Sequence, residues 1–259
     1  MRKRLQFASR YLKYWLYAKH NTKSAFVNSI IKEVVQSNKK FYSFKEIESI
    51  RSVLKKNNSK IKITDFGAGS SINKSKERRI SDLTKNSAKG PWLGETLFRL
   101  VNKFQPNNML ELGTSLGISA CYQIGANKNA NFTTLEGCPE TAKIAEKVLS
   151  NFNAKNVKIK VGDFSKTLFE VLDNYEELDY VFFDGNHQQK PTIEYFEMCL
   201  KKTHENSIFI FDDIHWSKDM EEAWKYIQSH SSVTCTIDIF WLGMVFFKKM
   251  QSKEHYIIR

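Results

Sequence analysis

From Asn108 onward, strand-length apolar runs alternate with helix-like segments. The apolar runs cover residues 109–112, 132–135, 157–161, 178–183 and 208–211. Helix-like segments such as 139–149 and 192–200 separate most of them. Strands that alternate with helices form βαβ units, and these units build a parallel sheet. This part of the chain is therefore predicted to fold as an α/β domain.

Two further β-rich runs, 233–239 and 244–247, end the pattern and are separated only by residues 240–243. A parallel crossover needs about a dozen residues or more, so these two runs can pair only as an antiparallel hairpin. The sequence thus predicts an α/β sheet of seven strands, mostly parallel, with an antiparallel hairpin near its C-terminal end.

The residues before this alternation carry apolar positions at helical spacing. A first helix is indicated by a stripe of five residues, and others are expected over 26–35, from Ser43 onward and over 93–104. The third helix is placed by Ser43 and Glu46, which have the spacing of a capping box. The stripe of the first helix consists of Leu5, Ala8, Leu12, Trp15 and Leu16.

Charge is divided unevenly along the chain. Residues 1–110 hold 24 Lys and Arg against 7 Asp and Glu, whereas residues 111–259 hold 16 against 21. A uniformly basic nucleic-acid binder would not show this division. We predict a helical extension or lid with a basic loop over residues 1–89, and a domain that carries the chemistry over residues 90–259.

A glycine loop follows the first apolar run and leads into helix-forming residues. Its spacing is Gly113-x-x-x-Gly117, with Ser115 where a dinucleotide-binding loop needs its middle glycine. The loop is therefore poorly shaped for a pyrophosphate. Glu111, near the end of the preceding run, would repel phosphate and attract an ammonium group.

Two more acidic residues follow the next apolar runs. Glu136 comes 23 positions after Gly113 (136 − 113), a spacing that suits a carboxylate accepting hydrogen bonds from ribose hydroxyls. Asp163 follows the third run, where it could accept from an adenine amino group. Together with Glu111, they describe a ligand with an adenosine and an amino acid end but no phosphates, which S-adenosylmethionine fits.

On these residues the sequence resembles the class I S-adenosylmethionine-dependent methyltransferases, over roughly residues 90–247. The resemblance implies a Rossmann-like methyltransferase sheet and makes Glu111–Gly117 the first cofactor motif. It implies that Glu111 holds the methionine amino group, that Glu136 holds the ribose and that Asp163 holds the adenine. The other cofactor-binding residues that it implies are Gly113, Thr114, Ser115, Gly117, Ser119 and Asp184.

Carboxylates also follow the fourth and fifth runs, at Asp184, Asp212 and Asp213. Ligands bind beyond the carboxyl ends of the strands in open α/β sheets, and like charges so close must be protonated, hydrogen-bonded or metal-bound. Oxygen ligands favour Mg²⁺, and His187 or His215 would shift the preference toward Mn²⁺ or another transition metal. Asp184 as a helix cap and Asp212 as a hydrogen-bonded loop acid are the structural alternatives.

This second pattern resembles the metal-dependent O-methyltransferases of the catechol and caffeoyl-CoA type and of macrolide sugars. The resemblance implies that Asp184, Asp212 and Asp213 bind the metal. Three residues after the first Asp, catechol-type enzymes have a lysine base, whereas this chain has His187, as the sugar enzymes do. We expect Asp184 and His187 to be catalytic, with His187 as the general base acting on an acceptor hydroxyl.

Another glycine-rich segment, residues 63–70, also resembles a methyltransferase loop. The sequence after it is basic and lacks an apolar helical stripe, and no acidic strand end follows at the right distance. We therefore interpret it as a turn. The basic stretch Lys74, Lys76, Arg78, Arg79, Lys85 and Lys89 is expected to be a solvated loop or to recognise an anionic acceptor.

Three interpretations stay open for the basic, aromatic N-terminal helix: a lid or homodimer contact, a peripheral membrane helix, or an RNA-binding arm. No apolar run is long enough for a transmembrane helix, the N-terminus lacks a signal-peptide core, and the four cysteines form no CxxC pair. We predict a cytoplasmic O-methyltransferase that acts on a small molecule, with nucleic acid disfavoured as a partner. The alternatives are an RNA or protein methyltransferase that uses the basic N-terminal segment, and a non-catalytic nucleotide-binding or interaction module.

Overall fold

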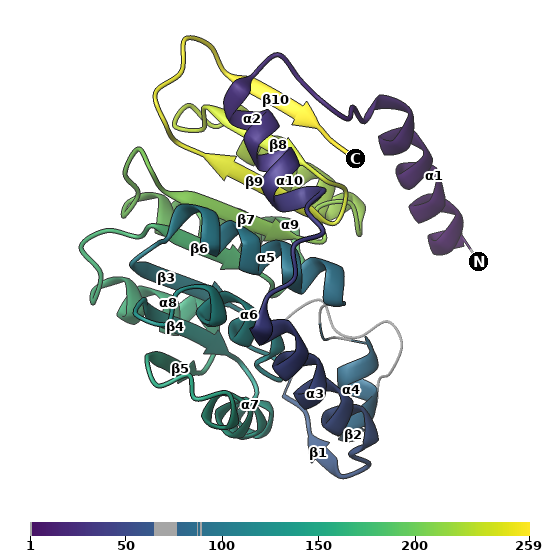
Figure 1. The fold of residues 1–259 in the computed structure, drawn as a ribbon, viewed down its shortest axis with the longest axis vertical. Helices are drawn as coiled ribbons and strands as arrows, with labels where there is room; N and C mark the ends of the chain where they lie inside the picture. The colour runs from purple at the N-terminus through teal and green to yellow at the C-terminus, as the bar shows by residue number, and fades with distance from the viewer. Residues whose placement is uncertain (1, 65–76, 87, 89) are drawn as a thin grey trace. The chain divides into compact units, whose positions relative to one another are not determined.

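The computed structural model describes residues 2–64, 77–86, 88 and 90–259, with side chains from residue 6 onward (Figure 1). The chain divides into two compact units. The middle unit is Asn38–Asn174, and the terminal unit joins Met1–Ser37 to Tyr175–Arg259. The predicted domain boundary after residue 89 stays a prediction.

The middle unit contains three parallel strands with helices between them. β3 (Asn108–Leu112) pairs with β4 (Asn131–Glu136), and β4 pairs with β5 (Val157–Val161). Buried aromatic rings of Phe44, Phe98 and Tyr122 lie among its helices. A small antiparallel pair is formed by β1 (Lys60–Lys62) and β2 (Glu77–Arg79). The helices are α3 (Tyr42–Lys56), α4 (Ile80–Asn86), α5 (Pro91–Phe104), α6 (Ile118–Ala126), α7 (Pro139–Asn151) and α8 (Phe164–Leu172).

The terminal unit contains five strands in the order β10-β8-β9-β7-β6. β6 and β7 are parallel, β9 is antiparallel to both β7 and β8, and β10 is parallel to β8. Its elements are α1 (Arg2–Tyr17), α2 (Ala25–Ile30), the π-helix η1 (Ile31–Val35), β6 (Tyr180–Phe183), α9 (Gln189–Leu200), β7 (Ile208–Asp212), α10 (Lys218–Ser229), β8 (Cys235–Asp238), β9 (Leu242–Phe246) and β10 (Glu254–Ile257).

The predicted α/β fold is confirmed, including the parallel strands, the closing hairpin formed by β8 and β9, and the helical N-terminal region. All five predicted parallel strands are present, each within two residues of its expected bounds. Strand β10 was not predicted, because its sequence, Glu-His-Tyr-Ile, is short and largely polar.

Two local predictions are wrong. Helix α3 begins at Tyr42 with Phe41 as its N-cap and has no side-chain capping bond, so Ser43 and Glu46 form no capping box. The stretch expected to be a solvated loop contains β2 and α4, and α4 buries the side chains of Ile80 and Leu83. Most of the competing glycine-rich segment, together with Lys74, Lys76 and Lys89, lies outside the described residues.

Candidate functional site

In the middle unit, the predicted cofactor loop begins directly after β3. The backbone amides of Gly113 and Thr114 donate to the carbonyl oxygen of Leu135, at 2.9 and 3.0 Å, which ties the loop to the end of β4. Gly113 has φ 114° and Gly117 has φ 79°, conformations that L side chains rarely adopt. Gly117 is also the N-cap of α6, so both glycines are needed for this turn from strand to helix.

Glu136, the last residue of β4, anchors the same loop. Its Oε2 accepts a hydrogen bond from the backbone amide of Ser115 at 2.7 Å, and its Oε1 accepts one from the amide of Cys138 at 2.9 Å. Ser115 has φ 48°, so this bond helps to hold a residue in an unfavourable conformation. A carboxylate has about four acceptor sites, and Glu136 is only half-buried, so its side chain is within reach of a ligand.

Glu111 lies in the interior and has protein partners for both carboxylate oxygens. Gln123 Nε2 donates to Oε1 at 2.7 Å, and the hydroxyl of Thr134 donates to Oε2 at 2.6 Å. The Thr134 hydroxyl also lies 2.6 Å from that of Thr114. Glu111 is 0% exposed. Its carboxylate is connected to the cofactor loop through the hydroxyls of Thr134 and Thr114. The sequence did not reveal Gln123 or Thr134, because Gln123 reaches Glu111 from α6 and Thr134 lies opposite Glu111 only in the register of β3 with β4.

The predicted cofactor residues of the middle unit fall into two groups by burial. Gly113, Ser115, Glu136 and Asp163 are partly accessible, whereas Glu111, Thr114, Gly117 and Ser119 are buried. Asp163 is the N-cap of α8, where its side chain accepts from the amide of Ser165 at 3.0 Å. A ligand can touch the first group directly, and the second group shapes the loop.

In the terminal unit, the structure brings together Asp184, His187 and Asp212. One ligand atom from each of the three lies within 4.8 Å of the other two. The strand register explains part of this, because β6 and β7 are parallel with Phe183 opposite Phe211, so the two aspartates follow neighbouring strand positions. Two carboxylate oxygens and an imidazole nitrogen form a donor set that suits Mg²⁺ or Mn²⁺.

His187 reaches this cluster through an unusual loop backbone. Asn186 and His187 both have positive φ, 71° and 48°, and His187 Nε2 lies 3.7 Å from Asp184 Oδ1. Non-glycine residues in this conformation cost free energy and concentrate at functional sites. The N-cap of α9 is Gln188, so Asp184 does not cap that helix.

Asp213 is not among the three clustered residues. It has φ 54°, and its backbone amide donates to the carbonyl oxygen of Trp241 at 2.8 Å. Its carbonyl in turn accepts from the amide of Trp216 at 2.9 Å. The backbone of Asp213 thus links two loops of the terminal unit, and its predicted role as a metal ligand stays a prediction.

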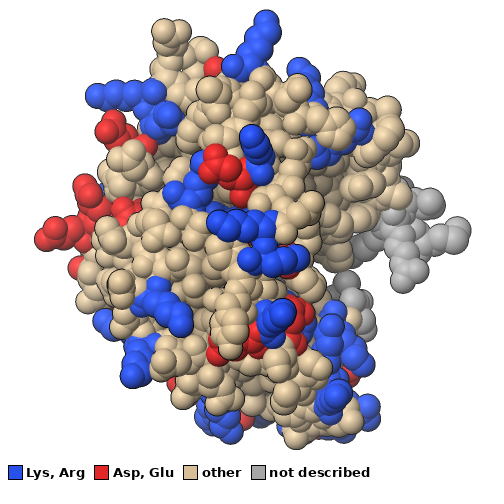
Figure 2. Space-filling view, in the orientation of Figure 1, with Lys and Arg blue, Asp and Glu red and all other residues tan. Residues whose placement is uncertain are grey.

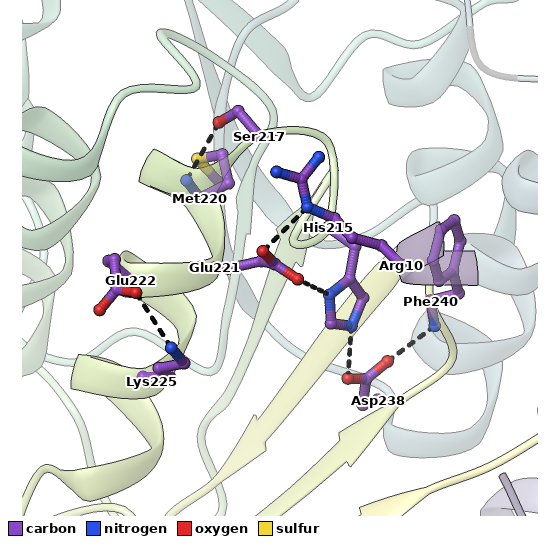
Figure 3. Close-up of polar contacts among 9 residues, drawn as sticks. All are labelled: Arg10, His215, Ser217, Met220, Glu221, Glu222, Lys225, Asp238 and Phe240. Atoms are coloured by element: carbon purple, nitrogen blue, oxygen red, sulfur yellow. Dashed lines mark hydrogen bonds and ion pairs between the residues drawn. The ribbon is translucent and has the colours of Figure 1, made fainter. Parts of the chain in front are cut away.

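His215 lies in a separate polar network, which Figure 3 shows. Its Nε2 is 2.8 Å from Asp238 Oδ2 and its Nδ1 is 3.3 Å from Glu221 Oε1. Glu221 also accepts from Arg10 Nε at 2.9 Å, and the imidazole stacks on the ring of Phe240. Burial lowers the pKa of His215, but hydrogen bonds and charge from Asp238 and Glu221 outweigh it, so the pKa is raised above its usual value. These contacts tie the loop that carries His215 to α10 and to the end of β8.

The raised pKa predicts a pH dependence of stability. A group whose pKa is higher in the folded state stabilises the fold fully below its unfolded pKa, and this contribution is lost as pH rises through the folded value. The loss of unfolding free energy in His215→Gln should therefore be larger at pH 5.5 than at pH 9, as measured by urea denaturation. In an Asp238→Asn background this difference should shrink, and a pH-independent difference would contradict the prediction.

The comparisons with known proteins agree with this fold. Residues 110–214 match the family model of a methyltransferase domain. The structure superposes on an O-methyltransferase from Bacillus cereus in complex with S-adenosylhomocysteine, with a TM-score of 0.57 and 18% identity over 82% of this chain and 93% of that one. It also superposes on a putative caffeoyl-CoA O-methyltransferase from Staphylococcus aureus, with a TM-score of 0.56 and 16% identity over 64% and 88%.

Among curated proteins, an uncharacterized protein of Acanthamoeba polyphaga mimivirus is 28% identical over 139 residues, which are 49% of this chain and 62% of that protein. The matched segment thus spans less than two thirds of this relative. The fold and the matched methyltransferase segment show that the chain resembles the class I S-adenosylmethionine-dependent methyltransferases.

Proposed function

We propose that this protein transfers a methyl group from S-adenosylmethionine to a hydroxyl group of a small molecule, with a divalent metal assisting. The observation that carries the proposal is the cluster of Asp184, His187 and Asp212, which follows β6 and β7 in a fold shared with O-methyltransferases. A bound Mg²⁺ or Mn²⁺ would lower the pKa of the acceptor hydroxyl. The proposed location is the cytoplasm.

The middle unit would supply the binding surface for the cofactor. Gly113 and Ser115 offer backbone atoms in a fixed turn, and Glu136 accepts from ribose hydroxyls while it holds that turn. Asp163 is proposed to contact the adenine, with one of its oxygens already accepting from Ser165. Glu111 acts on the loop through Thr134 and Thr114, and the assignment of Glu111 to the methionine amino group stays a prediction. The remaining proposed members in this unit are Gly117, which fixes the turn, and Ser119. Asp184, a residue of the terminal unit, is also proposed to contact the cofactor.

The terminal unit would supply the metal ligands and the base. Asp184 and Asp212 are proposed to hold the metal, with Asp213 as a further candidate. His187 is proposed as the general base that takes the proton of the acceptor hydroxyl, because a neutral imidazole can accept a proton near neutral pH. Because His187 lies in the cluster with Asp184 and Asp212, it could instead be a third metal ligand, and the effect of His187→Gln on Mg²⁺ affinity distinguishes the two roles.

A methyl-transfer assay tests this proposal. Purified protein is incubated with S-adenosylmethionine labelled in its methyl group and a panel of hydroxylated small molecules, with EDTA or with added Mg²⁺. We expect transfer to at least one acceptor, loss of transfer in EDTA and recovery with excess Mg²⁺. Undiminished transfer in EDTA would exclude a role for the metal in the reaction. Failure of the protein to bind S-adenosylhomocysteine would contradict methyl transfer altogether.

A further inference from the structure

One face of helix α1 packs closely on the rest of the terminal unit. Phe7 contacts the rings of Trp216, Phe240 and Trp241, with centroids 5.4 to 5.9 Å apart. The hydroxyl of Tyr14 donates to the carbonyl of Ile258, and both Tyr14 and Ala18 are buried. With the ion pair from Arg10 to Glu221, these contacts fix which side of the helix faces outward.

The outward side of α1 is apolar as well. Three members of the stripe from which the helix was predicted are exposed: Leu12 is 59% exposed, Trp15 is 49% exposed and Leu16 is 66% exposed. Residues at i, i+3 and i+4 share one helix face, so these three side chains form a continuous surface. Exposing so many large apolar groups on one helix is costly in water and marks an interaction surface.

The stretch of chain that carries this surface has charged side chains of one sign. From Met1 to Lys32 the chain has eight Lys and Arg and no Asp or Glu. Lys13 and Lys19 are both exposed, and the Arg259 guanidinium lies 4.4 Å from the centre of the Trp15 ring. In Figure 2 the surface over α1 is mostly tan with blue side chains beside it. The partner must therefore offer negative charge beside an apolar layer.

Neither a second copy nor RNA fits this pattern as well as a lipid surface. A symmetric dimer through α1 would bring the same basic segment of both copies together, and like charges oppose such a contact. RNA binds through aromatic stacking and basic side chains, which leaves the exposed Leu12 and Leu16 without a partner. An anionic bilayer meets both needs, because its interface takes up apolar side chains and Trp while its headgroups attract Lys and Arg.

We propose that α1 docks the protein on an anionic lipid surface, with Leu12, Trp15 and Leu16 inserted at the headgroup boundary and Lys13 and Lys19 against the headgroups. Exposed Trp216 and Trp241, which contact Phe7 of α1, extend the apolar surface of the terminal unit. The proposal does not depend on methyl transfer.

Sedimentation of the full chain with vesicles tests the docking. We expect binding to vesicles of phosphatidylcholine with phosphatidylglycerol, little binding to phosphatidylcholine alone, and a steep decline with salt. Leu12→Ser with Leu16→Ser should weaken binding about 10-fold or more. Lys13→Gln with Lys19→Gln should weaken it about 25-fold, at about fivefold per lysine near an anionic surface.

Matched variants on the middle unit control for a general loss of surface groups. Val53→Ser with Phe169→Ser removes exposed apolar groups, and Lys147→Gln with Lys166→Gln removes exposed charges; both pairs should leave vesicle binding unchanged. Circular dichroism confirms that each variant is folded. Equal binding to neutral vesicles, or no vesicle binding at all, would overturn the proposal. A dimer seen in ultracentrifugation, and dissociated by Leu12→Ser with Leu16→Ser, would also overturn it. RNA binding that survives these substitutions, in a protein that does not bind vesicles, would overturn it as well.

Discussion

Asp212→Asn is expected to weaken Mg²⁺ binding on the order of 100-fold and to abolish metal-dependent methyl transfer. Loss of a group that only supports a metal ligand already costs 10–100-fold in affinity, so the loss of a proposed ligand should cost at least as much. Asp212 is the last residue of β7, is 1% exposed and contributes to the cluster with Asp184 and His187. Asparagine keeps the shape of the side chain and removes its charge, so the effect reports the charge.

Calorimetric titration with Mg²⁺, and electron paramagnetic resonance with Mn²⁺, measure this effect directly. Asp219→Asn, an exposed acid in the first turn of α10, is the matched control and should bind metal as the wild type does. A thermal melt shows whether Asp212→Asn is still folded. Unchanged metal affinity in a folded Asp212→Asn protein would eliminate this cluster as the metal site.

Substituting His187 separates its two proposed roles. If His187 is the general base, His187→Gln should lower kcat by about 10²–10⁴-fold and leave Mg²⁺ affinity intact. If His187 is a metal ligand, the same substitution should weaken Mg²⁺ binding as Asp212→Asn does. The same titration with Asp213→Asn tests whether this residue, which is outside the cluster, binds metal at all.

The sequence predicted the parallel strands well because each is a short, strongly apolar run bounded by polar residues. It missed β10 because Glu254, His255 and Tyr256 show no such contrast, and this strand is placed by pairing with β8. The capping box at Ser43 failed for a related reason. The start of α3 lies beside packed rings of Phe41, Phe44 and Phe98, and this packing outweighs a local side-chain bond.

The candidate site was predictable where a residue ends a strand, as Glu136 and Asp212 do, or directly follows one, as Asp184 does. It was not predictable where a partner comes from another strand or from a distant helix. Thr134 meets Glu111 only because of the strand register, and Arg10 meets Glu221 across 211 residues of sequence. The N-terminal stripe was correctly recognised as helical, but periodicity alone could not show which of its two apolar faces would pack inward.

Glu136→Ala is expected to weaken the binding of S-adenosylhomocysteine by about 100-fold or more, from the micromolar affinity that we expect of the wild type. The carboxylate would lose its bonds to ribose hydroxyls, and hydrogen bonds to charged groups contribute about 1.5–3 kcal/mol each. The loop would also lose the bond that holds Ser115 at positive φ, so the turn itself becomes less well ordered. Both effects lower affinity, and calorimetric titration measures their sum.

A graded series shows which of the two effects dominates. Glu136→Gln keeps one carbonyl oxygen that can accept from the amide of Ser115 and loses the negative charge, so its affinity should lie between those of wild type and Glu136→Ala. Glu140→Gln, which changes a partly exposed acid in the first turn of α7, is the control and should bind as the wild type does. If Glu136→Ala bound S-adenosylhomocysteine with wild-type affinity, the ligand would not contact the end of β4. The Gly113–Gly117 loop would then be a strand–helix turn without a cofactor, because its one accessible acidic anchor would have no part in binding.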